Sequence, residues 1–155
     1  MEIRRAVKDD IPGINALLRQ VLEIHHKGRP DLFKTGCKKY TDEQLADIIA
    51  DDERPIFAAA ENGSILGYAF CIFERHKNDN VLTDITTLYI DDLCVDESLR
   101  GKHIGKALFD HVKEFARSAG CHNITLNVWE CNPPAQRFYE KMGMLPQKTY
   151  LETVL

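Results

Sequence analysis

The chain of 155 residues lacks any long apolar run and lacks the spacings typical of metal sites. No stretch of about 18 consecutive apolar residues occurs, which argues against a membrane-spanning helix. The five cysteines form no Cys-x-x-Cys pair and the six histidines show no His-Glu-x-x-His spacing. We therefore expect neither a disulfide framework nor a bound metal. The first residues, Met1 to Arg5, contain no apolar stretch typical of a signal peptide, so a cytoplasmic location is expected.

An excess of positive charge is also missing. The formal net charge is −4, which argues against a nucleic-acid-binding protein. The charges are nevertheless segregated, because an acidic segment directly precedes a basic one. The acidic residues are Asp79, Asp84, Asp91, Asp92, Asp96 and Glu97, and the basic ones are Arg100, Lys102, His103 and Lys106. Such a neighbourhood indicates a site that binds a cation on one side and a polyanion on the other.

Internal repeats and linkers are absent, so we expect one domain over residues 1–155. Apolar periodicity predicts helices from Ile11 to Leu22, after Thr41, from Ile104 to Ala119 and after Asn132. It predicts strands at Ile3–Val7, Ile56–Ala60, Ile65–Phe73, Thr86–Val95, Ile124–Val128 and Thr149–Leu155. Asn62-Gly63 between two apolar runs predicts a hairpin, whereas a strand, a helix and a further strand near the end require a parallel crossover. A mixed α/β sheet follows.

The most informative segment runs from Leu93 to Leu108 and combines a strand end, a turn with two glycines and a helix start. Unpaired N–H groups at such a turn point into one concavity, and the helix dipole adds partial positive charge. The turn is suited to hold a pyrophosphate, although an ordinary glycine-containing turn remains the alternative. The turn consists of Arg100, Gly101, Lys102, His103, Ile104, Gly105 and Lys106.

This segment resembles the signature of the GNAT acetyltransferase superfamily, in which a strand ending in Leu-x-Val leads to Arg/Gln-x-x-Gly-x-Gly/Ala. Arg100 matches the first position of that signature, Gly105 matches the last, and Gly101 matches a glycine often found after the arginine. His103 stands where the family has its middle glycine. The backbone of His103 can still donate its N–H, but its side chain must point away from the phosphates, and we expect a partly exposed turn residue.

The segment from Asn132 to Gly143 resembles a second GNAT signature, Asn-x-x-Ala-x-x-x-Tyr-x-x-x-Gly-Phe, with Met144 in place of the phenylalanine. The resemblance implies that Asn132 contacts the pantetheine arm of acetyl-coenzyme A and that Tyr139 protonates the departing thiolate. A helix-face core aromatic is the alternative for Tyr139. The resemblance also implies that the backbone of Leu93, Cys94 and Val95 binds the pantetheine arm and the thioester carbonyl. No pairing of Cys94 with a histidine and an acid is evident, which argues against a cysteine acyl-enzyme.

The resemblance further implies a central mixed sheet of six to seven strands flanked by about four helices, with acetyl-CoA as cosubstrate. An amine must lose a proton before it attacks, and a carboxylate can accept that proton. Asp91 and Asp92 lie just before the cofactor-binding strand end, and alternation sends them to opposite faces, so at most one should point into the acceptor cleft. A bulge in this strand would shift that parity, so the choice between the two residues stays open. Asp91 is slightly favoured, because polyamine acetyltransferases carry acidic residues in a similar place. Charges on a strand edge are the alternative for both.

Other positions bear on the acceptor. In the ribosomal-protein N-terminal acetyltransferases a glutamate on the next strand is the base, and Asn127 stands at the apparent match here. The two N-terminal helices and their loop wall the acceptor site in the family. That region includes His25, His26, Arg29, Asp31, Phe33 and Tyr40.

The sequence therefore predicts an acetyl-CoA-dependent transfer of an acetyl group to a primary amine by direct attack. The acidic segment favours a small cationic acceptor such as a polyamine or an aminoglycoside. Acetylation of a protein N-terminus or lysine is the enzymatic alternative, and a non-catalytic CoA-binding or interaction module is the alternative of another class. The terminal strand Thr149–Leu155 offers an edge for pairing in a homodimer.

Overall fold

A five-stranded mixed sheet forms the centre of the protein, described by a computed structural model of residues 1–155. The strands lie in the sheet in the order in which they follow in the chain. The neighbours from β1 to β4 pair antiparallel, and β4 and β5 pair parallel. Their bounds are β1 (Glu2–Arg5), β2 (Ile56–Glu61), β3 (Ser64–Arg75), β4 (Thr86–Val95) and β5 (Asn123–Leu126). The predicted mixed sheet is confirmed.

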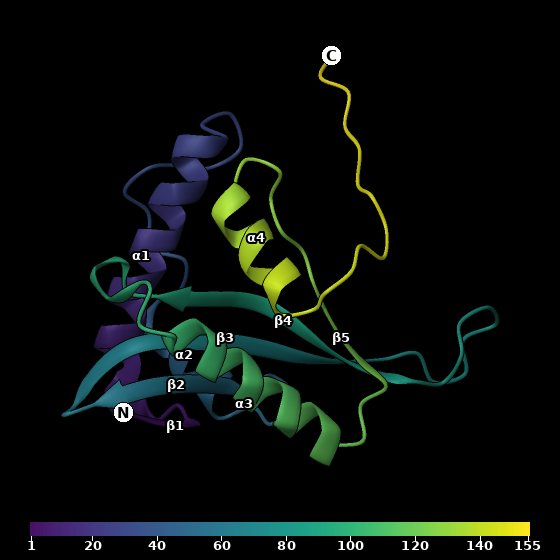
Figure 1. Ribbon diagram of the computed structural model, residues 1–155, viewed down its shortest axis with the longest axis horizontal. Helices are drawn as coiled ribbons and strands as arrows, with labels where there is room; N and C mark the ends of the chain where they lie inside the picture. The colour runs from purple at the N-terminus through teal and green to yellow at the C-terminus, as the bar shows by residue number, and fades with distance from the viewer.

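Helices cover both faces of the sheet (Figure 1). One core cluster joins α1 (Ile11–Gly28) and α2 (Asp42–Ile49) to one face. A second cluster joins α3 (Ile104–Ser118) to the other face, with residues of α4 (Pro133–Lys141) packed against it. Two short 3-10 turns complete the structure, η1 (Lys8–Asp10) and η2 (Glu97–Leu99). None of the helices combines the length and apolarity needed to cross a bilayer.

Local sequence signals account for most element ends. Thr41 and Gln44 form the predicted capping box of α2, since the Gln44 N–H donates to Thr41 Oγ1 at 3.1 Å and the Thr41 N–H donates to Gln44 Oε1 at 2.9 Å. Asn62 and Gly63 form the predicted hairpin turn, with φ angles of 50° and 77°. Asp10 precedes α1, but its carboxylate is bound by Arg4 rather than by the helix N-terminus.

The chain end departs from the prediction. The sheet has five strands rather than six to seven, because Thr149–Leu155 forms no strand. In addition, β5 is shorter than predicted and ends at Leu126, before Val128. A strand needs a hydrogen-bonded neighbour and a covered face. The segment after Gly143 instead leads away from the sheet (Figure 1), and Tyr150 and Leu151 are almost fully exposed. The edge on which the homodimer prediction rested is therefore absent.

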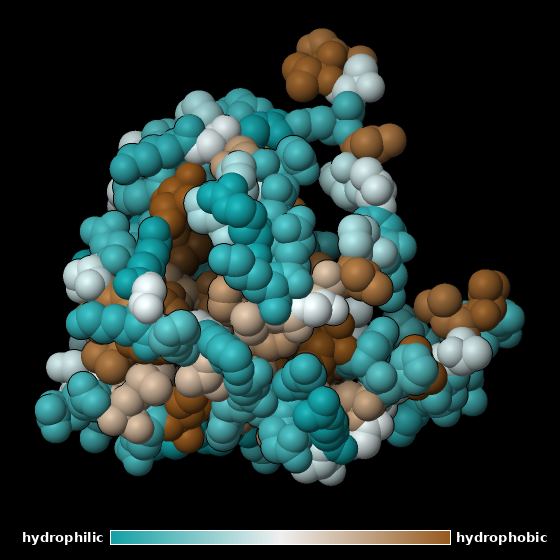
Figure 2. All heavy atoms as spheres, in the orientation of Figure 1, coloured by the Kyte–Doolittle hydropathy of each residue, from teal (hydrophilic) through white to brown (hydrophobic).

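Apolar side chains also show on the surface at two separate places. Figure 2 shows hydrophobic residues at the end of the chain and at the loop between β3 and β4. It also shows a hollow between α1 and α4 in which hydrophobic residues are visible. That hollow leads to the site described next.

Candidate active site

The sheet opens where β4 and β5 diverge. Their parallel pairing ends at Ile90 and Leu126, whereas β4 continues to Val95. Along this continuation Leu93 and Val95 pair with β3 only. Every second backbone group on this edge therefore points into the opening without a strand partner. The opening offers peptide-like hydrogen bonds to a ligand.

A turn rich in free N–H groups stands at the end of this opening. Gly101 has φ of +84° and His103 has φ of +62°, so the chain twice enters the left-handed region before α3 begins. Several N–H groups of the turn and of the first residues of α3 have no acceptor in the protein. They belong to Gly101, His103, Ile104, Gly105 and Lys106. Together with the helix dipole, these donors form a site suited to phosphate oxygens. His103 is exposed, as predicted.

Gly105 brings α3 close to β4 and α4. A Cβ atom placed on Gly105 would lie 3.4 Å from the Phe138 ring and 3.5 Å from Val95 Cγ2, which is ordinary van der Waals contact. The protein itself therefore tolerates a methyl group there. The side chains of Arg100 and Lys102 are exposed beside the turn, and Lys106 forms an ion pair with Asp110 one turn along α3.

The unpaired edge of β4 and the donor-rich turn are continuous in the chain, so the two features fit one elongated ligand. Such a ligand has amide groups along its arm and phosphates at one end, which is the chemistry of acetyl-CoA. Leu93 to Val95 would hold the arm and the turn from Arg100 to Lys106 would hold the pyrophosphate. No cluster of three or more histidine, cysteine, aspartate or glutamate side chains that could hold a metal ion occurs in the structure.

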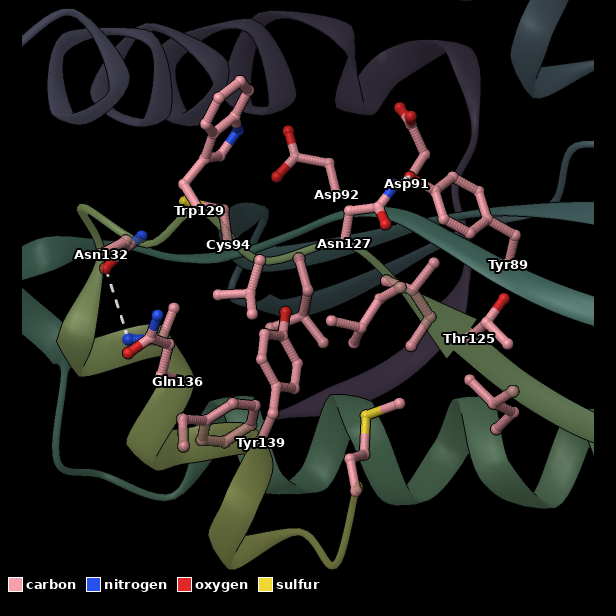
Figure 3. A pocket seen from close by; sticks show the side chains of 18 of the residues that line it. Tyr89, Asp91, Asp92, Cys94, Thr125, Asn127, Trp129, Asn132, Gln136 and Tyr139 are labelled. Atoms are coloured by element: carbon pink, nitrogen blue, oxygen red, sulfur yellow. Dashed lines mark hydrogen bonds between the residues drawn. The ribbon is translucent and has the colours of Figure 1, made fainter. Parts of the chain in front are cut away.

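Helix α4 places Asn132 and Tyr139 beside the same opening. The Asn132 side-chain oxygen accepts the Ala135 N–H at 3.3 Å and caps the helix, while its amide nitrogen has no protein acceptor. Tyr139 packs against Phe109 and Phe138, and its hydroxyl points toward β4 (Figure 3). Burial, together with the nearby carboxylate of Asp92, raises the pKa of Tyr139 well above its usual value. The phenol is therefore a neutral hydrogen-bond donor at pH 7.

Asp91 and Asp92 lie on the same side of β4, contrary to the alternation expected from the sequence. Phe70 pairs with Asp92 and Cys71 pairs with Ile90, so Asp91 is the extra residue of a β-bulge. Lys39 Nζ lies 3.1 Å from Asp91 Oδ2 and 3.8 Å from Asp92 Oδ2. Both carboxylates line the cavity on the side facing α1, opposite Tyr139 (Figure 3).

The two carboxylates differ in their surroundings. The Asp92 side chain is 11% exposed, that of Asp91 is 31% exposed, and Tyr68 on β3 donates its hydroxyl hydrogen to Asp92 Oδ2 at 3.0 Å. Burial raises the pKa of Asp92, although the Lys39 ammonium and the Tyr68 hydroxyl oppose that rise. A carboxylate with a raised pKa accepts a proton more readily, so Asp92 is suited to act as a base, although the sequence slightly favoured Asp91.

Cys94 is poorly suited to act as a nucleophile. Its side chain is buried, and burial raises the pKa of its thiol to about 12. The thiol therefore remains protonated at neutral pH, in agreement with the rejection of an acyl-enzyme.

Aromatic side chains line the cavity next to α1. Phe33 lies 5.2 Å from Trp129 and 5.0 Å from His25 between ring centroids, so the loop after α1 is packed against the loop after β5. Arg29 fixes this loop through Asp31 and through Glu152 of the chain end.

The two polar positions beyond β5 are engaged elsewhere. Asn127 donates to the Tyr89 hydroxyl at 3.1 Å, and Glu130 accepts from Gln136 at 3.1 Å. The amide of Asn127 has no basic group, and the carboxylate of Glu130 is occupied by Gln136.

Sequence reasoning missed Lys39 and Tyr68, the two partners of the acidic pair. Tyr68 pairs in register with Cys94 across β3 and β4. The alternation of side chains along β3 could therefore have indicated that Tyr68 lies on the same face of the sheet as Cys94. Lys39 lies in an irregular loop and reaches β4 across 52 residues of sequence, and no local pattern indicates such a contact.

Comparison with known proteins agrees with this geometry. A family model described as Acetyltransferase (GNAT) family matches residues 18–144. The chain belongs to the GNAT acetyltransferase family. As a GNAT protein it is similar to a solved structure of the BH1408 protein of Bacillus halodurans, a point mutant, with a TM-score of 0.95, 28% identity and coverage of 100% of this chain and 99% of that one.

Two curated GNAT relatives are named for different acceptors. Streptothricin acetyltransferase of Streptomyces lavendulae is 32% identical over 59% of this chain and 44% of its own length, so this chain matches less than half of that enzyme. The peptidyl-lysine N-acetyltransferase YjaB of Salmonella typhimurium is 25% identical over 92% of this chain and 82% of its own length. Their names therefore do not agree on the acceptor of this GNAT protein.

Proposed function

We propose that this protein is an acetyl-CoA-dependent N-acetyltransferase whose acceptor is a small cationic primary amine. One observation carries the choice of acceptor: the β4 bulge turns the carboxylates of Asp91 and Asp92 to the same ammonium group, that of Lys39. A pair of carboxylates beside the thioester position attracts a cation and can remove its proton.

The proposed reaction is a direct attack. Asp92 takes a proton from the acceptor ammonium, and the nitrogen lone pair then forms a bond to the thioester carbonyl carbon. Backbone N–H groups on the free edge of Leu93 to Val95 stabilise the negative charge that develops on the carbonyl oxygen. The carbon–sulfur bond breaks as Tyr139 donates its hydroxyl hydrogen to the sulfur. The new amide nitrogen gives up its second proton to solvent, and Tyr139 regains a proton from solvent while Asp92 releases one to it, so that one proton is released in each turnover.

The two reactants approach from opposite sides of β4. The cavity side facing α1 carries the acidic pair, whereas Tyr139 approaches the strand from α4 (Figure 3). The divergence of β4 and β5 connects the two sides, so both substrates can be bound at once. Holding them together supplies a large part of the rate in such reactions.

The experiment that tests the proposal combines binding and turnover. The purified protein is titrated with acetyl-CoA by calorimetry, and release of the CoA thiol is then measured with spermidine, an aminoglycoside, a lysine-containing peptide and a peptide with a free N-terminus. Saturable binding and thiol release on a small cationic amine are expected. Binding without release on any small amine would contradict the proposed acceptor.

Acetylation of protein lysine is the second candidate, and the similarity to peptidyl-lysine N-acetyltransferase YjaB favours it. A lysine side chain presents the same ammonium group to Asp91 and Asp92. Faster thiol release with the lysine peptide than with spermidine would support this candidate.

A further inference from the structure

The acidic pair of the proposed acceptor site is already bound to an ammonium group of the protein itself. Lys39 Nζ lies within 4 Å of both carboxylates, and the Lys39 side chain is 30% exposed. A lysine ammonium is chemically the same group as the primary ammonium of the proposed acceptor. Both groups therefore compete for the same oxygens.

The loop that carries Lys39 is held at other points. His26 Nδ1 and the Phe33 carbonyl oxygen lie 2.6 Å apart, and Lys38 forms an ion pair with Asp42 at 2.6 Å. Lys39 makes the hydrogen bond and both ion pairs that join this loop to β4, and its flexible four-carbon stem can swing away without moving the loop backbone. Its departure would expose two carboxylates and leave the anchors of the loop intact.

We propose that Lys39 occupies the position of the acceptor ammonium and that a cationic acceptor binds by displacing it. The inference rests on the proposed function and deepens it. Lys39 sets a threshold, because an acceptor binds only when its cation interacts with Asp91 and Asp92 better than Lys39 does. A neutral amine has no charge with which to replace it.

Lys39 also affects the base. The positive charge of Lys39 opposes the rise of the Asp92 pKa, so its removal is expected to shift the acid limb of kcat/KM to higher pH. Several ionisable groups lie around the Asp92 carboxylate. They are Lys39 and Tyr40 of the loop, Tyr68 of β3, Asp91 and Cys94 of β4, and Tyr139 of α4. Lys39 is the only cation in this group.

The test compares Lys39→Met, which keeps the apolar stem and removes the charge, with Lys39→Arg and Lys38→Met. Spermidine is the probe, and its dissociation constant is measured by calorimetry with coenzyme A present. Lys39→Met is expected to bind spermidine about fivefold more tightly than the wild type, since a partly exposed ion pair no longer has to be broken. Lys39→Arg and the matched control Lys38→Met, whose lysine pairs with Asp42, should stay within about twofold of the wild type.

Turnover supplies the second measurement. In Lys39→Met, KM for spermidine should fall more than kcat changes, and the acid limb of kcat/KM should move to higher pH. A lysine that merely stabilises the fold would give neither effect, and its loss would lower the melting temperature instead.

The outcomes separate the two proposals. Equal or weaker spermidine binding by Lys39→Met overturns the inference, as does the absence of spermidine binding by every variant. If the wild type acetylates amines while binding is unchanged in Lys39→Met, the proposed function stands and the inference fails. If the wild type releases no CoA while Lys39→Met binds spermidine more tightly, the proposed function fails, and only the competition of Lys39 with a cation for the two carboxylates stands.

Discussion

Replacement of Asp92 by asparagine should separate activity from stability. The amide keeps the size of the carboxylate and can still accept the hydrogen of the Tyr68 hydroxyl, whose oxygen lies 3.0 Å from Asp92 Oδ2. It cannot accept a proton from the acceptor. General-base catalysis typically contributes about 10²- to 10⁴-fold, so we expect kcat/KM to fall about 10²- to 10³-fold, or about 3–4 kcal/mol.

The stability of the same variant should change in the opposite direction. The pKa of Asp92 is raised in the folded protein, so the folded state binds a proton more tightly than the unfolded chain. Ionisation of Asp92 therefore lowers the free energy of unfolding as the pH rises from the ordinary carboxyl pKa through the raised pKa of Asp92. Asparagine does not ionise, and the variant should melt at a higher temperature than the wild type at pH 7 but not at pH 3.

Thiol release at saturating acetyl-CoA measures the activity, and circular dichroism melts at the two pH values measure the stability. Asp91→Asn is the matched control, because Asp91 is more exposed and has no contact with Tyr68. Its kcat/KM should fall less than that of Asp92→Asn. A decrease of less than about threefold for Asp92→Asn, with the fold intact, would refute the assignment of Asp92 as base.

Three further substitutions probe the other parts of the site. Tyr139→Phe should lower kcat about tenfold or more while the dissociation constant of acetyl-CoA, measured by calorimetry, stays unchanged. Gly105→Val should weaken acetyl-CoA binding, because its additional methyl groups crowd the free N–H groups at the start of α3, whereas alanine, which the GNAT signature accepts at this position and whose Cβ would lie 3.4 Å from Phe138, should leave it unchanged. His103→Gly should raise the free energy of unfolding by up to about 1 kcal/mol in urea titrations, since the φ of +62° is unfavourable for histidine.

For each of these three predictions, one result would contradict the reasoning. Unchanged turnover in Tyr139→Phe would mean that the phenol does not assist the leaving sulfur. Unaltered acetyl-CoA binding by Gly105→Val would remove the support for a phosphate site at the start of α3. A less stable His103→Gly would mean that the imidazole makes a contribution larger than the strain that it imposes.

The sequence predicted those elements whose signals are local. The bounds of β4 agree with the prediction at both ends, and the predicted helix from Ile104 differs from α3 by a single residue at its end. Both rest on apolar periodicity bounded by turn residues. The hairpin at Asn62 and the capping box at Thr41 are equally local.

Features that depend on partners distant in the chain were not predictable in the same way. The bulge at Asp91 arises from how β4 pairs with β3 and reverses the parity that alternation gives. The contact of Lys39 with Asp91 crosses from a loop to a strand. The alternation of Thr149–Leu155 is typical of a strand, but a strand also requires a neighbour, and none lies beside this segment.

The divergence of β4 and β5 has a consequence for the stability of the molecule. A ligand that hydrogen-bonds along Leu93 to Val95 would complete the sheet there, and so would take the structural place of a missing strand. The folded state would bind this ligand and the unfolded chain would not, so its free energy of unfolding would rise by about 2.7 kcal/mol when the ligand is present at a hundred times its dissociation constant. The melting temperature would then report the concentration of the cosubstrate, and each release of CoA would briefly return the protein to its less stable, unliganded state.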